Sequence, residues 1–307
     1  MKTHSVSWLL AFALLLGTGW SQQAASSGEV PVSIVVSVEA KHHKDVPVVY
    51  KEDVRVFQGK DRLQVTEWVP FQGRDAGLEL FLLIDDASDP STGAQLDDLR
   101  KFVNALPAAT AIGVGYMNHG TVEVRQDPTT DHAQAAKALR IPMGLSGSSS
   151  SPYLSVTDLI KRWPPNRRAH EIFMITSGID ELQPGPGNSY LEQAIEHAQR
   201  AGVQVYSIYA SRAGHFGHTF WRLTQGQSNL SQLADSTGAE FYSQALDTPI
   251  SFGPFLNEFA DRLQHQFRLT FLIKAGDKGE YRHIKLETEV PNAELAAQDK
   301  VYVPAVK

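Results

Sequence analysis

The stretch that decides the fold runs over residues 77–93 and reads GLELFLLIDDASDPSTG. Its first half, which ends at Ile84, is a continuous apolar run, and such a run is typical of a strand buried on both faces of a parallel sheet. The run stops at Asp85 and Asp86, and small hydroxyl residues follow. A buried strand that ends in carboxylates predicts either a metal-binding corner or an acidic turn. The rest of the chain has to supply any further ligands.

Further buried strands follow and alternate with helical patterns. Helical spacing of apolar residues separates these strands, and Gly202 and Gly238 each follow a predicted helix. Alternating strands and helices predict βαβ units. We therefore expect a doubly wound α/β domain with a mostly parallel sheet over residues 77–250. Its other predicted buried strands are residues 110–117, 170–176 and 203–210.

Sequence rich in β-branched residues lies on both sides of this domain. Residues 30–75 show alternating apolar positions and a hairpin-like turn at residues 58–61. After a closing helix over residues 251–266, residues 267–307 turn to strands again, with a predicted hairpin around the segment GDKGE. We expect the strands of the two ends to pack together in a β-sandwich-like unit.

The N-terminal segment has the layout of a secretory signal peptide over residues 1–21, with a basic start, a short apolar stretch and small residues. An uncleaved anchor is the alternative, although a spanning helix needs roughly 20 apolar residues. The chain has no cysteine, and its formal net charge of −6 without a long basic run argues against nucleic acid as a partner. We expect a secreted or periplasmic protein with no membrane span in the mature chain.

Polar residues follow several predicted strands at the point where each strand ends. In an open parallel sheet, binding sites form beyond the carboxyl ends of the strands. Carboxylate and hydroxyl oxygens on several loops suit a hard divalent cation such as Mg²⁺. The polar residues found there are Asp85, Asp86, Ser88, Asp89, Ser91, the serine loop at residues 146–151, Ser177, Asp180, Ser211 and Arg212.

The order of elements, the acidic strand end, the serine loop and the segment MITSG (residues 174–178) resemble a von Willebrand factor type A domain. With its flanking β segments, nearly the whole mature chain is similar to exported bacterial von Willebrand factor A-related proteins. The resemblance implies a metal-ion-dependent adhesion site. The pattern of that site is Asp-x-Ser-x-Ser after the first strand, a Thr on a second loop and an Asp on a third.

This sequence departs from the pattern at several positions. Asp85 stands at the leading Asp, but Ala87 replaces the first Ser and Asp89 the second. The Thr position falls on Ser150 or Ser149. The resemblance thus implies Asp85, Asp89 and Ser150 as the ligands of a weak or lost site for Mg²⁺ or another divalent cation.

The third loop is altered as well, because Ser177 stands where the pattern has an Asp, with Asp180 nearby. Shifting the register by one residue would place Asp86 first and Ser88 second, but Pro90 would then take the last position. In the register that starts at Asp85, the remaining polar residues of the edge are predicted to contact a partner. They are Asp86, Ser88, Ser149 and Asp180.

We interpret the chain as a non-enzymatic exported protein-interaction module with an unknown protein partner and a degenerate adhesion site. One alternative is a hydrolase on a Rossmann-like sheet that uses Asp85 or Asp86 with His119 or His215. Another is a structural envelope protein that binds no ligand. The sequence lacks a G-x-S-x-G nucleophile elbow and a glycine-rich dinucleotide loop.

The segment GHFGHTFW, which follows the predicted strand at residues 203–210, leaves two questions open. His215 and His218 are three residues apart, but a zinc site needs a third ligand that the surrounding sequence does not offer. Phe220 and Trp221 are suited either to burial or to an exposed patch that contacts a partner.

Overall fold

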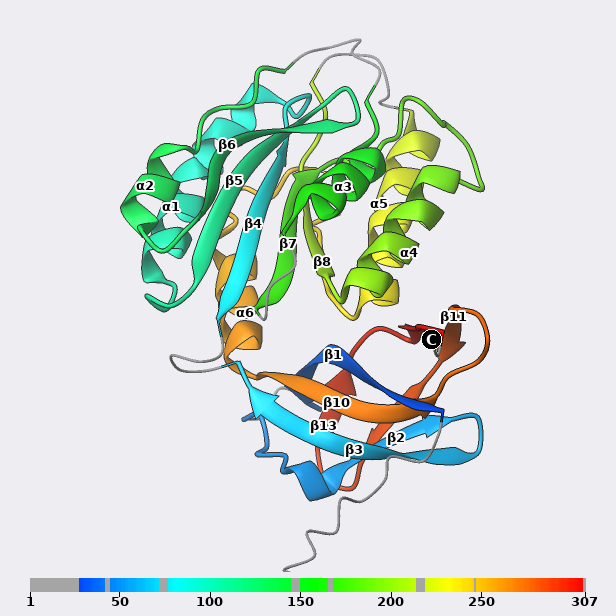
Figure 1. Ribbon diagram of the computed structural model, residues 1–307. Coiled ribbons are helices and arrows are strands. Elements are labelled where there is room, and N and C mark those ends of the chain that lie inside the picture. The colour runs from blue at the N-terminus through cyan, green and yellow to red at the C-terminus, as the bar shows by residue number, and fades with distance from the viewer. Residues whose placement is uncertain are drawn as a thin grey trace, which may run out of the picture.

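The computed structural model describes residues 28–41, 45–71, 77–144, 150–164, 168–213, 219–245 and 247–305. In Figure 1 these residues form an α/β part above and a β part below. The two parts are joined where helix α6 (Gly253–Gln264) runs into strand β10 (Gln266–Lys274). The predicted signal peptide at residues 1–21 lies outside the described residues.

The α/β part is built on a six-stranded sheet in the order β6-β5-β4-β7-β8-β9. All neighbouring pairs are parallel except β5 and β6, which are antiparallel. The chain enters at the central strand, winds to one edge and returns to the other side, so the direction of winding changes beside the C-terminal end of β4. The strands are β4 (Leu78–Asp85), β5 (Ala111–Asn118), β6 (Thr121–Thr129), β7 (Ala169–Thr176), β8 (Gln204–Tyr209) and β9 (Phe241–Tyr242).

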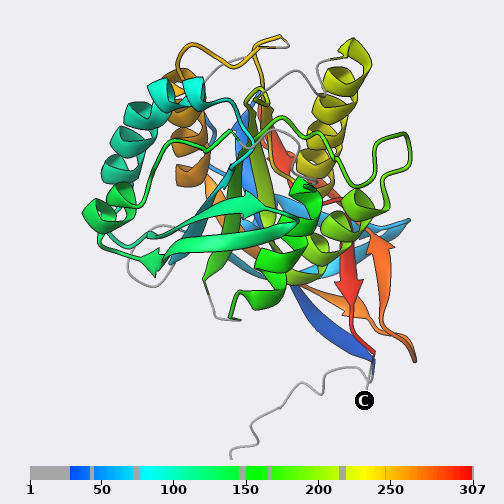
Figure 2. The same ribbon diagram turned by 90° about the horizontal axis from the view of Figure 1, so that it is seen from above.

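Helices cover both faces of this sheet, with α1 and α6 on one face and α3, α4 and α5 on the other (Figure 2). Alternate residues of β4 enter the two cores: Leu80 and Leu82 pack on one face, and Phe81 and Leu83 on the other. This explains the unbroken apolar run, because neither face of the strand meets water. The other helices are η2 (Pro90–Gln95), α1 (Leu96–Ala105), α2 (His132–Lys137), α3 (Pro152–Arg162), α4 (Ser189–Ala201) and α5 (Phe220–Thr237).

The strands of the two chain ends form a second six-stranded sheet, antiparallel throughout, in the order β12-β2-β3-β10-β1-β13. The predicted turn at residues 58–61 joins β2 to β3 as expected. The elements are β1 (Glu29–Ala40), η1 (Lys51–Asp53), β2 (Val54–Gln58), β3 (Asp61–Pro70), β12 (Lys285–Thr288), β13 (Ala293–Ala296) and a separate ribbon of β11 (Glu280–His283) and β14 (Lys300–Val303). The sandwich-like form of this unit stays a prediction.

The prediction of a C-terminal hairpin is wrong. Strand β10 is flanked by β1 on one side and β3 on the other, so neither of its edges is left for the segment that follows. That segment divides instead: β11 pairs with β14, and β12 pairs with β2. A turn signal shows where a chain reverses, but it does not show which strand edges are already paired with another strand.

A buried polar network lies where the two parts meet. The Gln266 amide nitrogen donates to Gln204 Oε1 at 3.0 Å and to Tyr206 Oη at 3.1 Å, and Arg262 Nε donates to the same Tyr206 oxygen at 3.2 Å. Glu171 is fully buried beside this network, near Gln266 and Arg262, which both act to lower its pKa. Burial raises the pKa of Glu171 to about 8.

Candidate functional site

The candidate site lies at the C-terminal end of β4, where the winding of the sheet changes direction. Such a point is where open α/β sheets bind ligands, because the loops after neighbouring strands diverge there. Four segments meet at this edge: the loop after β4, the end of the loop before α3, the loop after β7 and the residues after β8. Backbone pairing locks two of them together, since Asp89 N donates to Ser211 O at 2.9 Å and Ala213 N to Ala87 O at 3.0 Å.

Asp85, the last residue of β4, is held firmly inside this edge. It is 2% exposed, and its carboxylate accepts hydrogen bonds from Thr176 Oγ1 at 2.8 Å and from Ala87 N at 3.0 Å. Burial raises the pKa of Asp85, while the Arg212 guanidinium and the Thr176 hydroxyl act in the opposite direction. The leading residue of the predicted site is therefore present, but both of its oxygens already accept hydrogen bonds from the protein.

Arg212 is a site residue that the sequence interpretation placed after a buried strand but gave no role. Although it follows β8 in a loop, it is 3% exposed. Its Nη1 donates to Ser150 Oγ at 3.4 Å, and its Nε lies 3.8 Å from Glu181 Oε1. A backbone bridge to Ser88 fixes the residue against the loop after β4. Nothing in the local sequence indicates that its side chain would be buried.

Asp86, which we predicted to contact a partner, points into the protein. Arg140 grips its carboxylate with two hydrogen bonds, at 2.7 Å and 2.9 Å, and Met143 N donates to it at 2.9 Å. The Arg140 guanidinium also stacks on the Tyr116 ring at 3.9 Å. This paired arrangement ties the loop after β4 to the loop after α2, which is a structural use of the carboxylate.

Asp89 and Ser88 take local roles in the loop after β4. Asp89 is half-buried and caps η2, because its carboxylate accepts from Ser91 N at 2.8 Å. Ser88 is buried, and its hydroxyl has no partner among the residues that the structure describes. The one contact of the Asp89 carboxylate described here is thus within its own loop.

The serine loop is described from Ser150 onward, and Ser149 lies outside the described residues. Ser150 is buried at the site and is bonded to Arg212. Ser151 begins α3, because its hydroxyl accepts from Leu154 N at 3.3 Å, and it donates to Asp180 at 2.6 Å. The hydroxyl predicted as a ligand thus faces a guanidinium.

Asp180 and Ser177 hold the loop after β7 in shape. Asp180 accepts hydrogen bonds from Ser151 Oγ, Asn188 Nδ2 and the backbone nitrogens of Leu182 and Gln183. Ser177 is fully buried, and its hydroxyl accepts from Ile179 N at 3.3 Å. Asp180 is therefore an internal anchor of the loop in this structure, although we predicted a partner contact for it.

The residues at the edge do not fit a resident divalent cation. Both oxygens of Asp85 already accept hydrogen bonds and Ser150 faces Arg212, and the described residues include no cluster of three His, Cys, Asp or Glu side chains that could hold a metal. A cation beside Asp85 and Ser150 would meet the buried, positively charged Arg212, and like charges repel strongly where water is excluded. We therefore derive no function through a bound metal.

The hydrolase interpretation receives no support from the same geometry. Asp85 and Asp86 are bonded to Thr176, Arg140 and backbone nitrogens, so within the described chain neither carboxylate is oriented by a histidine. His119 lies in the turn between β5 and β6, while His215 and His218 fall outside the described residues.

No helix in the described part of the chain is long and apolar enough to cross a membrane.

Exposed apolar side chains gather at this edge. Nine large hydrophobic residues are well exposed in the described part of the chain, and six of them lie on the loops or helix starts at the C-terminal edge of the central sheet. The other three, Val48, Tyr50 and Val69, belong to the β part. Phe220 and Trp221 are thus exposed rather than buried, which settles the alternative that the sequence left open. The six are Ile141, Met143, Leu182, Phe220, Trp221 and Ile250.

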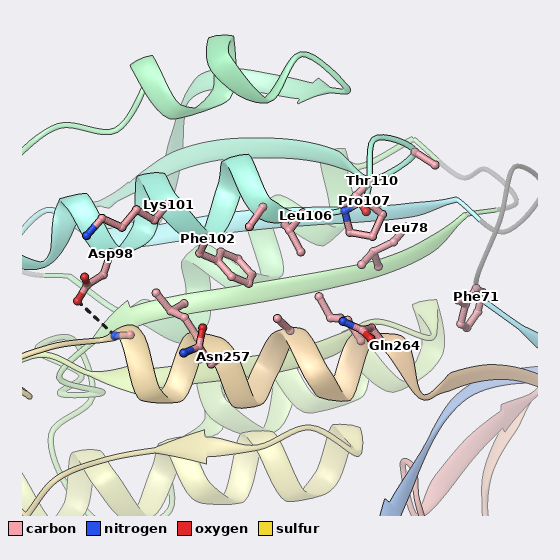
Figure 3. A pocket seen from close by; sticks show the side chains of 16 residues that line it. Phe71, Leu78, Asp98, Lys101, Phe102, Leu106, Pro107, Thr110, Asn257 and Gln264 are labelled. Carbon is pink, nitrogen blue, oxygen red and sulfur yellow. Dashed lines mark hydrogen bonds between the residues drawn. The ribbon is translucent and has the colours of Figure 1, made fainter. Parts of the chain in front are cut away.

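A cavity of about 560 Å³ lies between α1 and α6, away from Asp85 (Figure 3). Most of its lining is apolar, for example Phe102 and Leu106. Its acidic residue, Asp98, caps α6 by accepting hydrogen bonds from Ser251 Oγ at 2.7 Å and Gly253 N at 3.2 Å. The cavity is a gap between two helices, and its lining residues do not form a cluster of catalytic groups.

Two glycines allow α5 to approach the loop after β7. A Cβ atom on Gly226 would lie 2.4 Å from Ser177 O, and one on Gly178, whose φ is +69°, would lie 2.4 Å from Gly226 O. We expect Gly226→Ala to lower the free energy of unfolding by about 2–3 kcal/mol, because backbone atoms on both sides would have to move. Urea unfolding measures this change.

The matched control is Gly276→Ala. A Cβ at Gly276 would meet its nearest atoms at 3.8 Å, an ordinary contact distance. We expect that change to stay within about 0.5 kcal/mol. Equal losses in the two variants would show that the close approach of α5 does not set the position of the loop.

No family model matches the chain, and no curated protein matches it in sequence. Several solved structures are similar in fold. An aerotolerance-related membrane protein from Bacteroides fragilis is 12% identical over 61% of this chain and 98% of its own, with a TM-score of 0.45. A von Willebrand factor type A protein from Catenulispora acidiphila is 9% identical over 82% and 76%, with a TM-score of 0.46. The manganese-loaded TRAP protein of Plasmodium vivax is 11% identical over 76% and 96%, with a TM-score of 0.43.

The α/β part of this chain is a doubly wound domain with a mostly parallel sheet, as the sequence predicted from its resemblance to a von Willebrand factor type A domain. Its first strand is central, one edge strand is antiparallel, and helices cover both faces. At these identities and TM-scores we draw no argument about function from the similar structures.

Proposed function

We propose that this protein is a non-enzymatic interaction module that binds a protein partner at the C-terminal edge of the central sheet. The observation that carries the proposal is the gathering of six exposed large apolar side chains at that one edge. Exposed apolar patches of this kind are typical of contact surfaces, because burying them against a partner removes them from water.

Trp221 is the residue on which the proposal depends most. It is 51% exposed at the start of α5, and it lines a shallow hollow together with Pro184 and Gln225. Tryptophan is enriched among the residues that dominate binding energy, since it buries a large area and loses little conformational freedom. Phe220, beside it and more exposed still, extends the same surface.

In this proposal the acidic and hydroxyl residues at the edge are a degenerate adhesion site. They stabilise the conformation of the loops that carry the contact surface. Asp85, Asp89 and Ser150 stand at the ligand positions, while Ala87 and Ser177 break the set. Asp86, Ser88, Ser149 and Asp180 belong in this proposal to the residues of the same edge that contribute to the contact with a partner.

We also propose that the chain is exported, with a signal peptide at residues 1–21, and that it acts outside the cytoplasm. The α/β domain at residues 77–250 then carries the contact surface. The closing helix at residues 251–266 and the strands at residues 30–75 and 267–307 form the unit on which that domain is mounted.

Site-specific photo-crosslinking tests the proposal in cells that naturally produce the protein. A benzophenone amino acid at Trp221 is expected to capture one protein partner. Trp221→Ser is then expected to weaken binding of the purified pair by at least about tenfold, as loss of a central interface residue does. Surface plasmon resonance measures the affinity.

Tyr50 provides the matched control, because it is an aromatic residue of similar exposure, 65%, in the β part. Crosslinker at Tyr50 is expected to capture no partner, and Tyr50→Ser is expected to leave the affinity unchanged. Partner capture at Tyr50 and not at Trp221 would place the contact surface on the β part and contradict the proposal.

A further inference from the structure

Arg212 occupies an unusual place for an arginine that follows a strand in a loop. We propose that its guanidinium takes the place of a metal ion at this site, so that the edge is assembled and charge-balanced without any cation. Only the statement about the class of partner rests on the proposed function. The role of Arg212 is tested on the purified protein without a partner.

The contacts of Arg212 join the loops that a cation would join. Ser150 belongs to the loop before α3, Glu181 to the loop after β7, and the backbone bridge reaches Ser88 in the loop after β4. An arginine has five N–H donors in a planar fork, so one guanidinium can link oxygens from several segments at once. A bound metal would link them through coordination instead.

Arg212 is fixed in the fold beside the loop that begins at Asp85, the residue that would lead the ligand set. Its backbone pairs with Ser88, and both Arg212 and Asp85 are buried at this edge. A buried positive charge near a buried carboxylate offsets part of the cost of burying it. Because Arg212 is 3% exposed and its backbone is paired with the loop after β4, its side chain is a fixed part of the edge.

Two more arginines form ion pairs with acidic residues near this site. Arg140 grips Asp86, and Arg222 Nη1 lies 3.5 Å from Glu181 Oε2. Arginines of the protein itself thus neutralise Asp86 and Glu181 at this edge. A partner whose carboxylate would coordinate a bound metal gains no binding energy at an edge without a metal. The partner that fits is a neutral, apolar protein surface that contacts the six exposed side chains.

Manganese titration tests this inference on a matched pair of variants. Ala87→Ser with Ser177→Asp restores the two residues that the family pattern requires, and a second variant adds Arg212→Met to the same background. We expect no saturable Mn²⁺ binding by calorimetry for the wild type or for the first variant. The variant that lacks Arg212 is expected to bind Mn²⁺, with a Tm that rises by roughly 5 °C at saturating metal.

Saturable Mn²⁺ binding by the wild type that is lost in Asp85→Ala would overturn the inference, because Arg212 would then coexist with a working metal site. Equal Mn²⁺ binding with and without Arg212 would overturn it as well. If the variant with methionine does not fold, the first variant still decides the question, since Mn²⁺ binding in the presence of Arg212 contradicts the inference. None of these results depends on whether Trp221 contacts a partner.

Discussion

Replacing Arg212 by methionine is expected to lower the free energy of unfolding by about 3–5 kcal/mol, the range found when one member of a buried ion pair is removed. Methionine fills much of the same volume, so the loss is electrostatic rather than a cavity effect. The change leaves Asp85 buried with the hydrogen bonds of Thr176 and Ala87 but without a compensating charge.

A double-mutant cycle in urea separates this effect from general disruption. In the background of Asp85→Asn, which carries no charge to balance, Arg212→Met is expected to cost at least about 2 kcal/mol less than in the wild type. Arg125→Met is the control, since Arg125 pairs with Glu123 where both side chains are about half exposed. An exposed pair contributes roughly 0–1 kcal/mol. An additive cycle would show that Arg212 does not compensate Asp85.

Replacing Glu171 by glutamine is expected to stabilise the protein at alkaline pH. The pKa of Glu171 in the folded protein, about 8, lies above its ordinary value of 4.5. Between these values the folded state binds a proton that the unfolded state releases, so stability falls as pH rises from about 4.5 to 8 and levels off above that range. At about 1.4 kcal/mol for each pH unit, the loss from this one group is at most about 5 kcal/mol.

Thermal unfolding of both proteins from pH 5 to pH 9 measures this contribution. At pH 5 the two are expected to be similar, and at pH 9 the Tm of Glu171→Gln is expected to exceed that of the wild type by roughly 5–10 °C. Glu39 and Glu240 also have raised pKa values because of burial, so part of the pH dependence remains in the variant.

Glu192→Gln, on the exposed face of α4, is the control and is expected to leave the pH profile unchanged. A constant Tm difference between the wild type and Glu171→Gln across the pH range would contradict the titration of Glu171.

The central sheet could be predicted because its strands have a strong local signal. The run that ends at Ile84 is apolar on both faces, and alternate residues do enter two different cores. The strand pairing of the β part could not be predicted in the same way. Its sheet joins β1 to β10, where Ser33 lies opposite Thr270, and no local pattern shows which distant edges will meet.

The sequence showed where β4 ends but not which side chains surround that end. Asp85 lies at the expected strand end, yet the chemistry around it depends on Arg212, which is distant in sequence from both Asp85 and Ser150. An arginine in a loop normally keeps its head group in water, so its burial could not be read from composition or spacing. The exposure of Trp221 was undecided for a related reason, because an aromatic residue at a helix start suits either a core or a contact surface.

The most direct test of the arginine's role is a crystal structure of the wild-type protein grown in millimolar MnCl₂, with anomalous diffraction data that locate manganese. We expect no anomalous peak at the Asp85 carboxylate, and we expect the Arg212 guanidinium to contact Ser150 and Glu181. An anomalous peak coordinated by Asp85, with the Arg212 side chain turned away from the site, would contradict that role.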